Sequence, residues 1–299
     1  MKLGDGAKIT TTKNNTTLTF DTNTVNLGAG TGVTPVTATI QSAGGSIQFK
    51  PGAGTLDFTK DAAAASGLLQ LRGAAVSTDS GVNTTTIASG VTVDADNAVT
   101  VNAGTINNSG SLQTTGAASH VVLNTAALTN NATGSITTAT ALANITINAN
   151  GGTVDNSGNI TATNNLSVRS TSSLGVTNTA TGTLRATNGA LDLTSNGGLT
   201  VTNSNNIQSG TTLDINSGAA AGSTLLLTNN AAGIVNAGTT LTVQTGGTGA
   251  SLQVVNASGG IADMLANNGA LTITTNNQAG SNIAISGGGR LRNLVAGSV

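Results

Sequence analysis

Aliphatic and polar residues recur along this chain in a fixed order: an aliphatic residue, a spacer, an Asn, a turn of small residues and a second aliphatic residue. Seven copies lie between Ile106 and Ile261. Their Asn residues are Asn108, Asn130, Asn156, Asn178, Asn203, Asn229 and Asn256. The six intervals from the first Asn to the last cover 148 residues, about 25 each, which is typical of the coils of a solenoid.

The aliphatic residues on both sides of each Asn indicate two strands per coil. The residues that open the copies are Ile106, Leu128, Val154, Val176, Val201, Leu227 and Val255. The residues that close them are Leu112, Ile136, Ile160, Leu184, Ile207, Ile234 and Ile261. We expect these branched side chains to stack inside the solenoid, one coil over the next.

A third strand per coil is predicted by triplets of the form aliphatic–polar–aliphatic. They are Ile145–Ile147, Leu166–Val168, Leu191–Leu193, Leu213–Ile215, Leu241–Val243 and Leu271–Ile273. Alternation with a period of two is typical of a strand with one buried face. The sequence therefore predicts an all-β parallel β-helix, or β-solenoid, of about twelve coils of about 25 residues, with Thr, Ser, Asn and Asp pointing outward.

The recurring Asn has two expected tasks. At a tight corner an Asn tolerates left-handed backbone angles better than most residues. Its amide can also donate to one coil and accept from the other neighbour, so that the seven Asn residues form an internal ladder. The alternative is that Asn is simply abundant in the loops of this chain.

Composition supports strands and leaves little material for helices. All 11 acidic residues are Asp and none is Glu, and Glu is among the usual residues of helix surfaces. The segment Lys60–Gly67 is the one plausible helical turn, with Asp61 near its start. Disorder is disfavoured because 37% of the residues are hydrophobic and the net charge is −1.

The first sixty residues differ from the rest of the chain. Residues 1–60 hold all three Phe, both Pro and all five Lys. We expect them to form divergent or capping strand-rich coils, continuous with a regular solenoid over residues 61–299, because the end coils of solenoids are usually atypical. A separate small domain, or simple drift among the repeats, is the alternative.

Charge and cysteine content limit the partners. With 7% charged residues and a net charge of −1, nothing favours nucleic acid or an anionic membrane as partner. The absence of Cys excludes disulfides and thiolate metal sites. We expect no cofactor, no metal site and no transmembrane segment, since no apolar run approaches the required length. Residues 1–30 also contain no apolar segment typical of a signal peptide.

Two groups of residues are candidates for catalysis. His120 is the only His, so a catalytic triad has one possible centre, beside Ser119, but nothing marks this Ser as a nucleophile. Asp94 and Asp96 would share one face of a strand and could act as an acid/base pair. They have no basic residue near them in the sequence, and we expect a solvated turn. We therefore predict no catalytic residue and no enzyme.

The string Val154–Ile160, followed by Leu166–Val168, resembles the repeats of filamentous haemagglutinin-type adhesins and of autotransporter passenger domains of Gram-negative bacteria. The resemblance covers roughly residues 99–285. It implies a right-handed parallel β-helix that is secreted and displayed at the cell surface. The chain lacks the family's signal peptide, secretion domain and membrane translocator. These departures suggest a fragment, a processed product or a different surface use of the same solenoid.

The resulting hypothesis is a non-enzymatic extracellular or cell-surface structural protein, either an adhesin stalk or a self-assembling filament subunit. Its partners would be further copies of the chain, or a glycan or protein on a host or neighbouring surface. The alternative is a carbohydrate-active β-helix enzyme or a carbohydrate-binding solenoid, because parallel β-helices include polysaccharide lyases and hydrolases.

Overall fold

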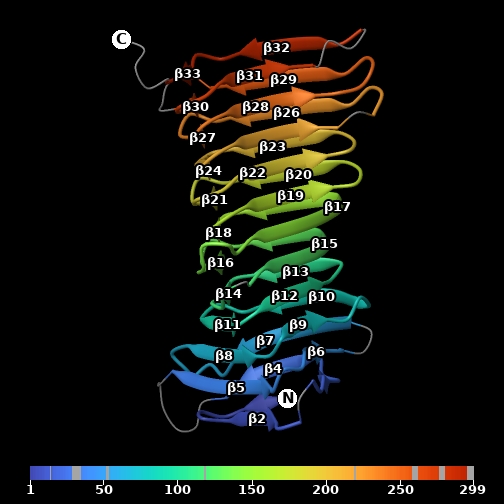
Figure 1. Ribbon diagram of the computed structural model, residues 1–299, viewed down its shortest axis with the longest axis vertical. Helices are drawn as coiled ribbons and strands as arrows, with labels where there is room; N and C mark the ends of the chain where they lie inside the picture. Colours follow the sequence, from blue (N-terminus) through green and yellow to red (C-terminus); the bar gives the residue numbers. More distant parts are fainter. Residues whose placement is uncertain are drawn as a thin grey trace.

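Parallel strands stack along one long axis, from strands near residue 2 to strands near residue 293 (Figure 1). The computed structural model describes residues 1–13, 15–28, 35–51, 54–117, 119–218, 220–257, 262–275 and 280–294. Within these ranges the chain is all-β, without a helix, and forms a parallel β-solenoid. The predicted fold class is thereby confirmed.

The strands form one 21-stranded and one 12-stranded sheet, which give the rod three faces. Face 1 contains β1 (Lys2–Leu3), β4 (Thr24–Leu27), β7 (Gly54–Lys60), β10 (Val82–Ile87), β13 (Thr105–Asn108), β20 (Leu174–Asn178), β23 (Leu199–Asn203), β26 (Thr224–Asn229), β29 (Ser251–Asn256) and β32 (Asn282–Ser286). Face 2 contains β3 (Leu18–Phe20), β6 (Ile47–Phe49), β9 (Ala75–Thr78), β12 (Ala98–Asn102), β19 (Leu166–Ser170), β22 (Leu191–Ser195), β25 (Leu213–Ser217), β28 (Leu241–Thr245) and β31 (Leu271–Thr274). The long strands β15 (Val121–Asn130) and β17 (Ile145–Asn156) run over both faces and join them into the larger sheet.

Face 3 is the 12-stranded sheet. It contains β2 (Lys8–Thr11), β5 (Val36–Ser42), β8 (Gly67–Arg72), β11 (Val91–Ala95), β14 (Ser111–Thr114), β16 (Ser135–Thr138), β18 (Asn159–Ala162), β21 (Thr183–Ala186), β24 (Asn206–Ser209), β27 (Ile234–Ala237), β30 (Asp263–Ala266) and β33 (Arg290–Asn293). Each turn of the solenoid contributes one strand to each face, as three short strands per coil predict.

The solenoid has about eleven turns, about 25 residues apart, one turn fewer than we expected. The N-terminal turns are longer: the in-register partners Ile9 and Ile40 lie 31 residues apart. In the regular region Leu112 and Ile136 lie only 24 apart. The additional residues of this turn leave the stacking of β2 on β5 intact.

Apolar side chains form continuous columns inside the rod. Val154 pairs in register with Val176, and Val176 with Val201, and all three are buried. The face 2 triplets superimpose in the same way, with Leu166 on Leu191. Because each strand directs alternate residues to the interior, the columns produce a continuous apolar core along the rod.

Two of the predicted core positions are wrong by one residue. Ile207 pairs with Val235 rather than Ile234, which faces outward. Likewise Val254, and not Val255, lies in the core column of face 1. In both cases a strand offers two adjacent aliphatic residues, and only one of them can face the core. Ile261, which was expected to close the last copy, lies outside the described residues.

The N-terminal turns are packed around aromatic rings. Phe20 stacks on Phe49 with ring centroids 5.5 Å apart, and Phe49 meets Phe58 edge to face at 5.4 Å. These turns pair directly with those that follow, for example Leu56 of β7 with Thr85 of β10. The predicted helical turn over Lys60–Gly67 is wrong: residues 61–66 form a short turn before β8.

Candidate functional site

The seven recurring Asn side chains are connected by hydrogen bonds inside the rod. Asn108 Nδ2 donates to Asn130 Oδ1 at 2.8 Å, and each later Asn donates to the next until Asn229 reaches Asn256 at 2.8 Å. All seven are at most 2% exposed. We call this chain the inner ladder; its residues are Asn108, Asn130, Asn156, Asn178, Asn203, Asn229 and Asn256.

The second N–H of each inner-ladder amide ties face 1 to face 3. It donates to the carbonyl oxygen of the residue that begins the face 3 strand of the next turn, as from Asn156 to Thr183 at 3.0 Å. The left-handed backbone expected at these corners is wrong. Among the described residues, Asn15 is the only non-glycine residue with a positive φ. The ladder therefore depends on the amide group rather than on the conformational tolerance of Asn.

The inner ladder begins where the aromatic part of the core ends. The position of Asn108 is occupied by Ile87 in the preceding turn and by Phe58 in the turn before. Asn108 Oδ1 is therefore buried without a hydrogen-bond partner among the described residues. At the other end Asn256 Nδ2 donates to the Arg290 carbonyl oxygen at 3.0 Å.

Asp94 and Asp96 differ from each other: Asp96 lies in the bend after β11 with its side chain 44% exposed, whereas Asp94 is buried on the strand. Arg72, on β8 of the preceding turn, contacts carboxylate oxygens of both residues, each at 2.8 Å. Gln113 Nε2 also donates to Asp94 Oδ1 at 3.1 Å, and the Asp94 side chain is only 8% exposed. No basic residue lies near this pair in the sequence, but stacking of the turns places Arg72 beside it. A carboxylate with these partners is a structural ion-pair centre.

Ser119 and His120 do not form a catalytic pair. The Ser119 hydroxyl is buried and donates to the Gly116 carbonyl oxygen at 2.8 Å. His120 is partly buried, and its Nδ1 accepts a hydrogen bond from the Asn144 backbone N–H at 3.2 Å. Both groups stabilise the loop that leads into β15.

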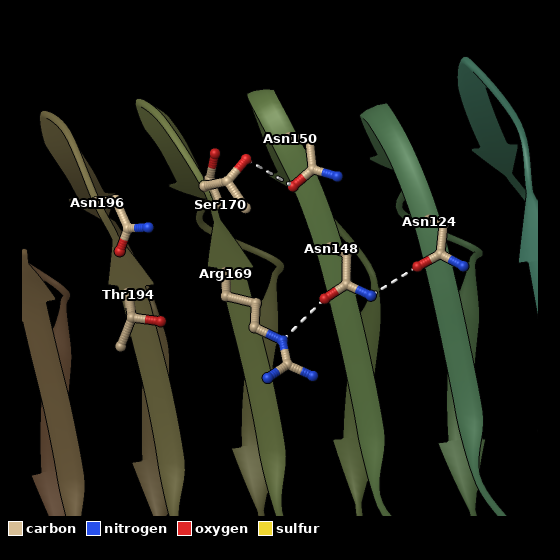
Figure 2. A pocket seen from close by; sticks show the side chains of 8 residues that line it. Asn124, Asn148, Asn150, Arg169, Ser170, Thr194 and Asn196 are labelled. Atoms are coloured by element: carbon tan, nitrogen blue, oxygen red, sulfur yellow. Dashed lines mark hydrogen bonds between the residues drawn. The ribbon is translucent and has the colours of Figure 1, made fainter.

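The outer surface of face 2 carries a second ladder that the sequence did not suggest. Arg169 Nε donates to Asn148 Oδ1 at 2.8 Å, and Asn148 Nδ2 donates to Asn124 Oδ1 at 2.6 Å (Figure 2). Asn124 Nδ2 donates in turn to Asn102 Oδ1 at 2.7 Å. We call this chain, Asn102, Asn124, Asn148 and Arg169, the outer ladder. Its donors point toward the N-terminal turns, opposite to those of the inner ladder.

A polar hollow of about 440 Å³ lies beside the outer ladder. Its lining comes from β15, β17, β19 and β22, so it crosses four consecutive turns along the rod. The lining residues are Asn124, Asn148, Asn150, Arg169, Ser170, Thr171, Thr194 and Asn196. A second hollow of about 340 Å³ shares Asn124 and Asn150 with the first and extends to Asn102 and Ser80. We call the two adjoining hollows the trough.

Two stacked aspartates lie beside the trough on face 2. Asp192 of β22 and Asp214 of β25 are in-register partners on adjacent strands. Burial and, to a lesser extent, the neighbouring Asp192 carboxylate together raise the pKa of Asp214 to about 6. Burial also raises the pKa of Asp192, and the charge of Arg169 opposes this shift. Asp214 Oδ1 is buried without a hydrogen-bond partner among the described residues.

Replacing Asp214 with Asn is expected to make the rod more stable at pH 7.5 but not at pH 4. The folded state holds the proton of Asp214 up to about pH 6, whereas an unfolded chain releases it near pH 4. Wild-type stability therefore falls as the pH rises through this window. Because the side chain is partly exposed, we expect a gain of only about 1 kcal/mol from D214N.

Urea unfolding of wild type and D214N at the two pH values measures this difference. An equal gain at pH 4 and at pH 7.5 would show that the variant stabilises the rod for a reason other than the ionisation of Asp214.

No family model, curated protein or solved structure matches the chain. The described residues contain no group of three or more His, Cys, Asp or Glu side chains able to hold a metal ion. In the same ranges, there is no helix with the length and apolar character needed to cross a membrane.

Proposed function

We propose that the protein is a non-enzymatic structural rod that acts as an adhesin stalk at the cell surface. The observation that carries this proposal is the unbroken stacking of the rod, in which apolar columns and the inner ladder connect one turn to the next. Since each turn is held by side-chain contacts as well as backbone pairing, the rod resists bending and unwinding. The resemblance of the repeats to haemagglutinin-type adhesins supports the extracellular location.

Joining of copies into a filament through the first and last described strands of face 3 is disfavoured by the charges on these strands. Lys8 lies on the first strand of face 3 and Arg290 on the last. Stacking the first strand of one copy on the last strand of another in register with the core column would place these cations side by side, because each precedes a core residue. Like charges on adjacent strands are destabilising. Asp263 pairs with both Arg290 and Arg292 and so offsets only one of their two positive charges, and we expect copies of the rod not to join through these two strands.

Electron microscopy tests this proposal. Purified protein is expected to appear as single straight rods, and gold-labelled antibodies are expected to decorate the surface of intact cells of the source organism. Rods joined end to end would indicate a filament subunit instead. Labelling confined to the cell interior would contradict the stalk.

A carbohydrate-active enzyme is a second candidate because of the Asp192–Asp214 pair. Two carboxyl groups with raised pKa values on adjacent strands resemble an acid/base arrangement in principle. Release of reducing ends or of unsaturated products from polysaccharides, lost in both D192N and D214N, would support this candidate. Persistence of that activity in both variants would exclude the pair as its source.

A further inference from the structure

We propose that the trough binds a linear polysaccharide that carries carboxylate groups, with the Arg169 guanidinium holding one carboxylate and the surrounding amides holding hydroxyl and ring oxygens. This inference deepens the proposed function and rests on it, since a stalk holds its ligand without cleaving it.

The Arg169 side chain is oriented by the outer ladder. Its Nε donates to Asn148 Oδ1 at 2.8 Å, which fixes one edge of the guanidinium, and Figure 2 shows the terminal nitrogens directed away from this bond. Within the described ranges these two nitrogens have no hydrogen-bond or ion-pair partner. A guanidinium presented in this way offers a planar pair of donors that matches the two oxygens of a carboxylate.

The side-chain amides of the trough also carry N–H groups that have no partner among the described residues. Asn124 and Asn148 each donate one side-chain N–H to the outer ladder. The second N–H of each amide has no partner among the described residues. The amide nitrogens of Asn150 and Asn196 likewise have none there, and both residues are exposed. The ladder occupies carbonyl oxygens and leaves N–H groups unpaired, so the trough presents mainly donors. Its complement is a ligand rich in acceptor oxygens.

The shape of the trough favours a chain over a single small molecule. The two hollows share Asn124 and Asn150 and follow the outer ladder across consecutive turns. Since neighbouring strands lie about 4.8 Å apart, amides recur along the trough at a spacing comparable to one sugar unit of an extended polysaccharide. A volume of about 440 Å³ for the larger hollow is within the range of ligand sites, about 300–1,000 Å³.

Other polymers fit the lining less well. A nucleic acid carries a phosphate on every nucleotide and requires many cations, whereas Arg169 is the only cation that lines the two hollows. The lining contains no aromatic side chain on which bases could stack. A peptide would find few apolar contacts, since Ala103 and Ala126 are the only hydrophobic residues in the lining.

Substitution of Asp192 is expected to change the affinity for the polysaccharide in the opposite direction to substitution of Arg169. Its carboxylate interacts with the Arg169 charge and competes with a bound carboxylate for it. Removing the charge in D192N is therefore expected to strengthen binding, whereas R169Q weakens it. Opposite effects from two neighbouring substitutions cannot arise from general loss of structure.

The test is calorimetric titration of the full chain with oligogalacturonate of about six sugar units, since the trough crosses six turns about 4.8 Å apart. We expect R169Q to weaken binding about tenfold, which corresponds to loss of one charge-assisted contact, and D192N to strengthen it a few-fold. Arg185 is the matched control, because it is an exposed arginine on face 3, away from the trough. R185Q is expected to bind as wild type does.

Three further ligands identify the chemistry. A carboxyl-reduced, neutral form of the same oligosaccharide is expected to bind at least tenfold more weakly, and the galacturonate monomer is expected to bind more weakly still. Dextran sulfate distinguishes a carboxylate site from a general anion site and is expected to bind no better than the neutral chain. Circular dichroism and the unfolding midpoint of each variant are measured in parallel.

Several results would overturn the inference: absence of binding to wild type, equal losses in R169Q and R185Q, or equal affinity for the neutral, sulfated and carboxylated chains. None of these results contradicts the proposed function as a stalk, provided that the rods remain single. Binding followed by cleavage of the oligosaccharide would instead contradict the proposed non-enzymatic function.

Discussion

Replacing Asn156 with Asp is expected to lower the free energy of unfolding by about 3–5 kcal/mol at pH 8. Asn156 is fully buried, and both of its N–H groups donate, to Asn178 Oδ1 at 2.9 Å and to the Thr183 carbonyl oxygen at 3.0 Å. An ionised Asp at this position cannot donate. It would place a buried negative charge against two acceptor oxygens, which is among the most costly changes in a protein interior.

The loss in N156D is expected to become smaller as the pH falls. A buried carboxyl without a cationic partner has a raised pKa, so the folded state takes up a proton that the unfolded chain releases near pH 4. The protonated carboxyl can donate one hydrogen bond to Asn178 and accept one from Asn130. Stability of this variant therefore decreases as the pH rises. Urea unfolding at pH 5 and pH 8 measures the difference.

Asn148 of the outer ladder supplies the matched control. It has the same two ladder bonds, donating to Asn124 and accepting from Arg169, but its side chain is partly exposed on face 2. In N148D the new carboxylate gains an ion pair with Arg169 and remains in contact with water. We expect a change of at most about 1 kcal/mol. Equal losses of unfolding free energy in N148D and N156D would show that burial does not increase the contribution of the inner ladder to stability.

The core columns were predictable because the repeat period and the strand period are both short and regular. Val154, Val176 and Val201 could be aligned from spacing alone, and their stacking was confirmed. The two errors, at Ile234 and Val255, came from the parity of the spacing. Core residues lie at even offsets from an inner-ladder Asn, both before it in the same strand, such as Ile106 before Asn108, and after the turn, such as Leu112. Within one strand alternation requires this offset and would have selected Val254. The same even offset, repeated after each turn, would have selected Val235.

The outer ladder, the trough and the Asp192–Asp214 pair were missed for a different reason. Their members lie 21–24 residues apart along the chain, and they meet only if the length of each turn is known. Turn lengths vary, since Ile9 and Ile40 are separated by 31 residues and Leu112 and Ile136 by 24. A mean period of about 25 therefore aligns aliphatic columns but not single polar residues. Arg72 beside Asp96 was missed in the same way.

The turn between faces 1 and 3 is a second position, after Asn156, at which a small change in a side chain is expected to lower the stability of the rod strongly. Gly182 lies between Asn178 of the inner ladder and the first residue of β21. A Cβ at this position would overlap the Asn156 carbonyl oxygen and the Asn178 Oδ1 atom. Gly134 and Gly233 occupy equivalent turns and would meet their own ladder amides in the same way. The absence of a side chain is thus what lets each turn approach the ladder.

Gly182→Ala is therefore expected to destabilise the rod by about 3 kcal/mol. The methyl group cannot be accommodated by a flexible side chain, because one of the overlapping atoms is backbone and the other is held in the ladder by Asn156. Relief requires moving β21 away from face 1, which breaks the bond from Asn156 to Thr183. A Gly→Ala change also restricts the unfolded chain and returns about 0.4–1 kcal/mol, so the measured loss is a net value.

Gly81→Ala separates the overlap from the general effect of losing a glycine. Gly81 lies in the turn before β10, and a Cβ there would meet no atom within 4 Å. G81A is expected to leave the urea midpoint unchanged or to raise it slightly, whereas G182A lowers it. If G182A were as stable as wild type, the turn would have room to move without cost. The inner ladder would then connect face 1 with face 3 through loose rather than fixed contacts, and the stiffness assigned to the rod would have to come from its backbone pairing and its apolar columns.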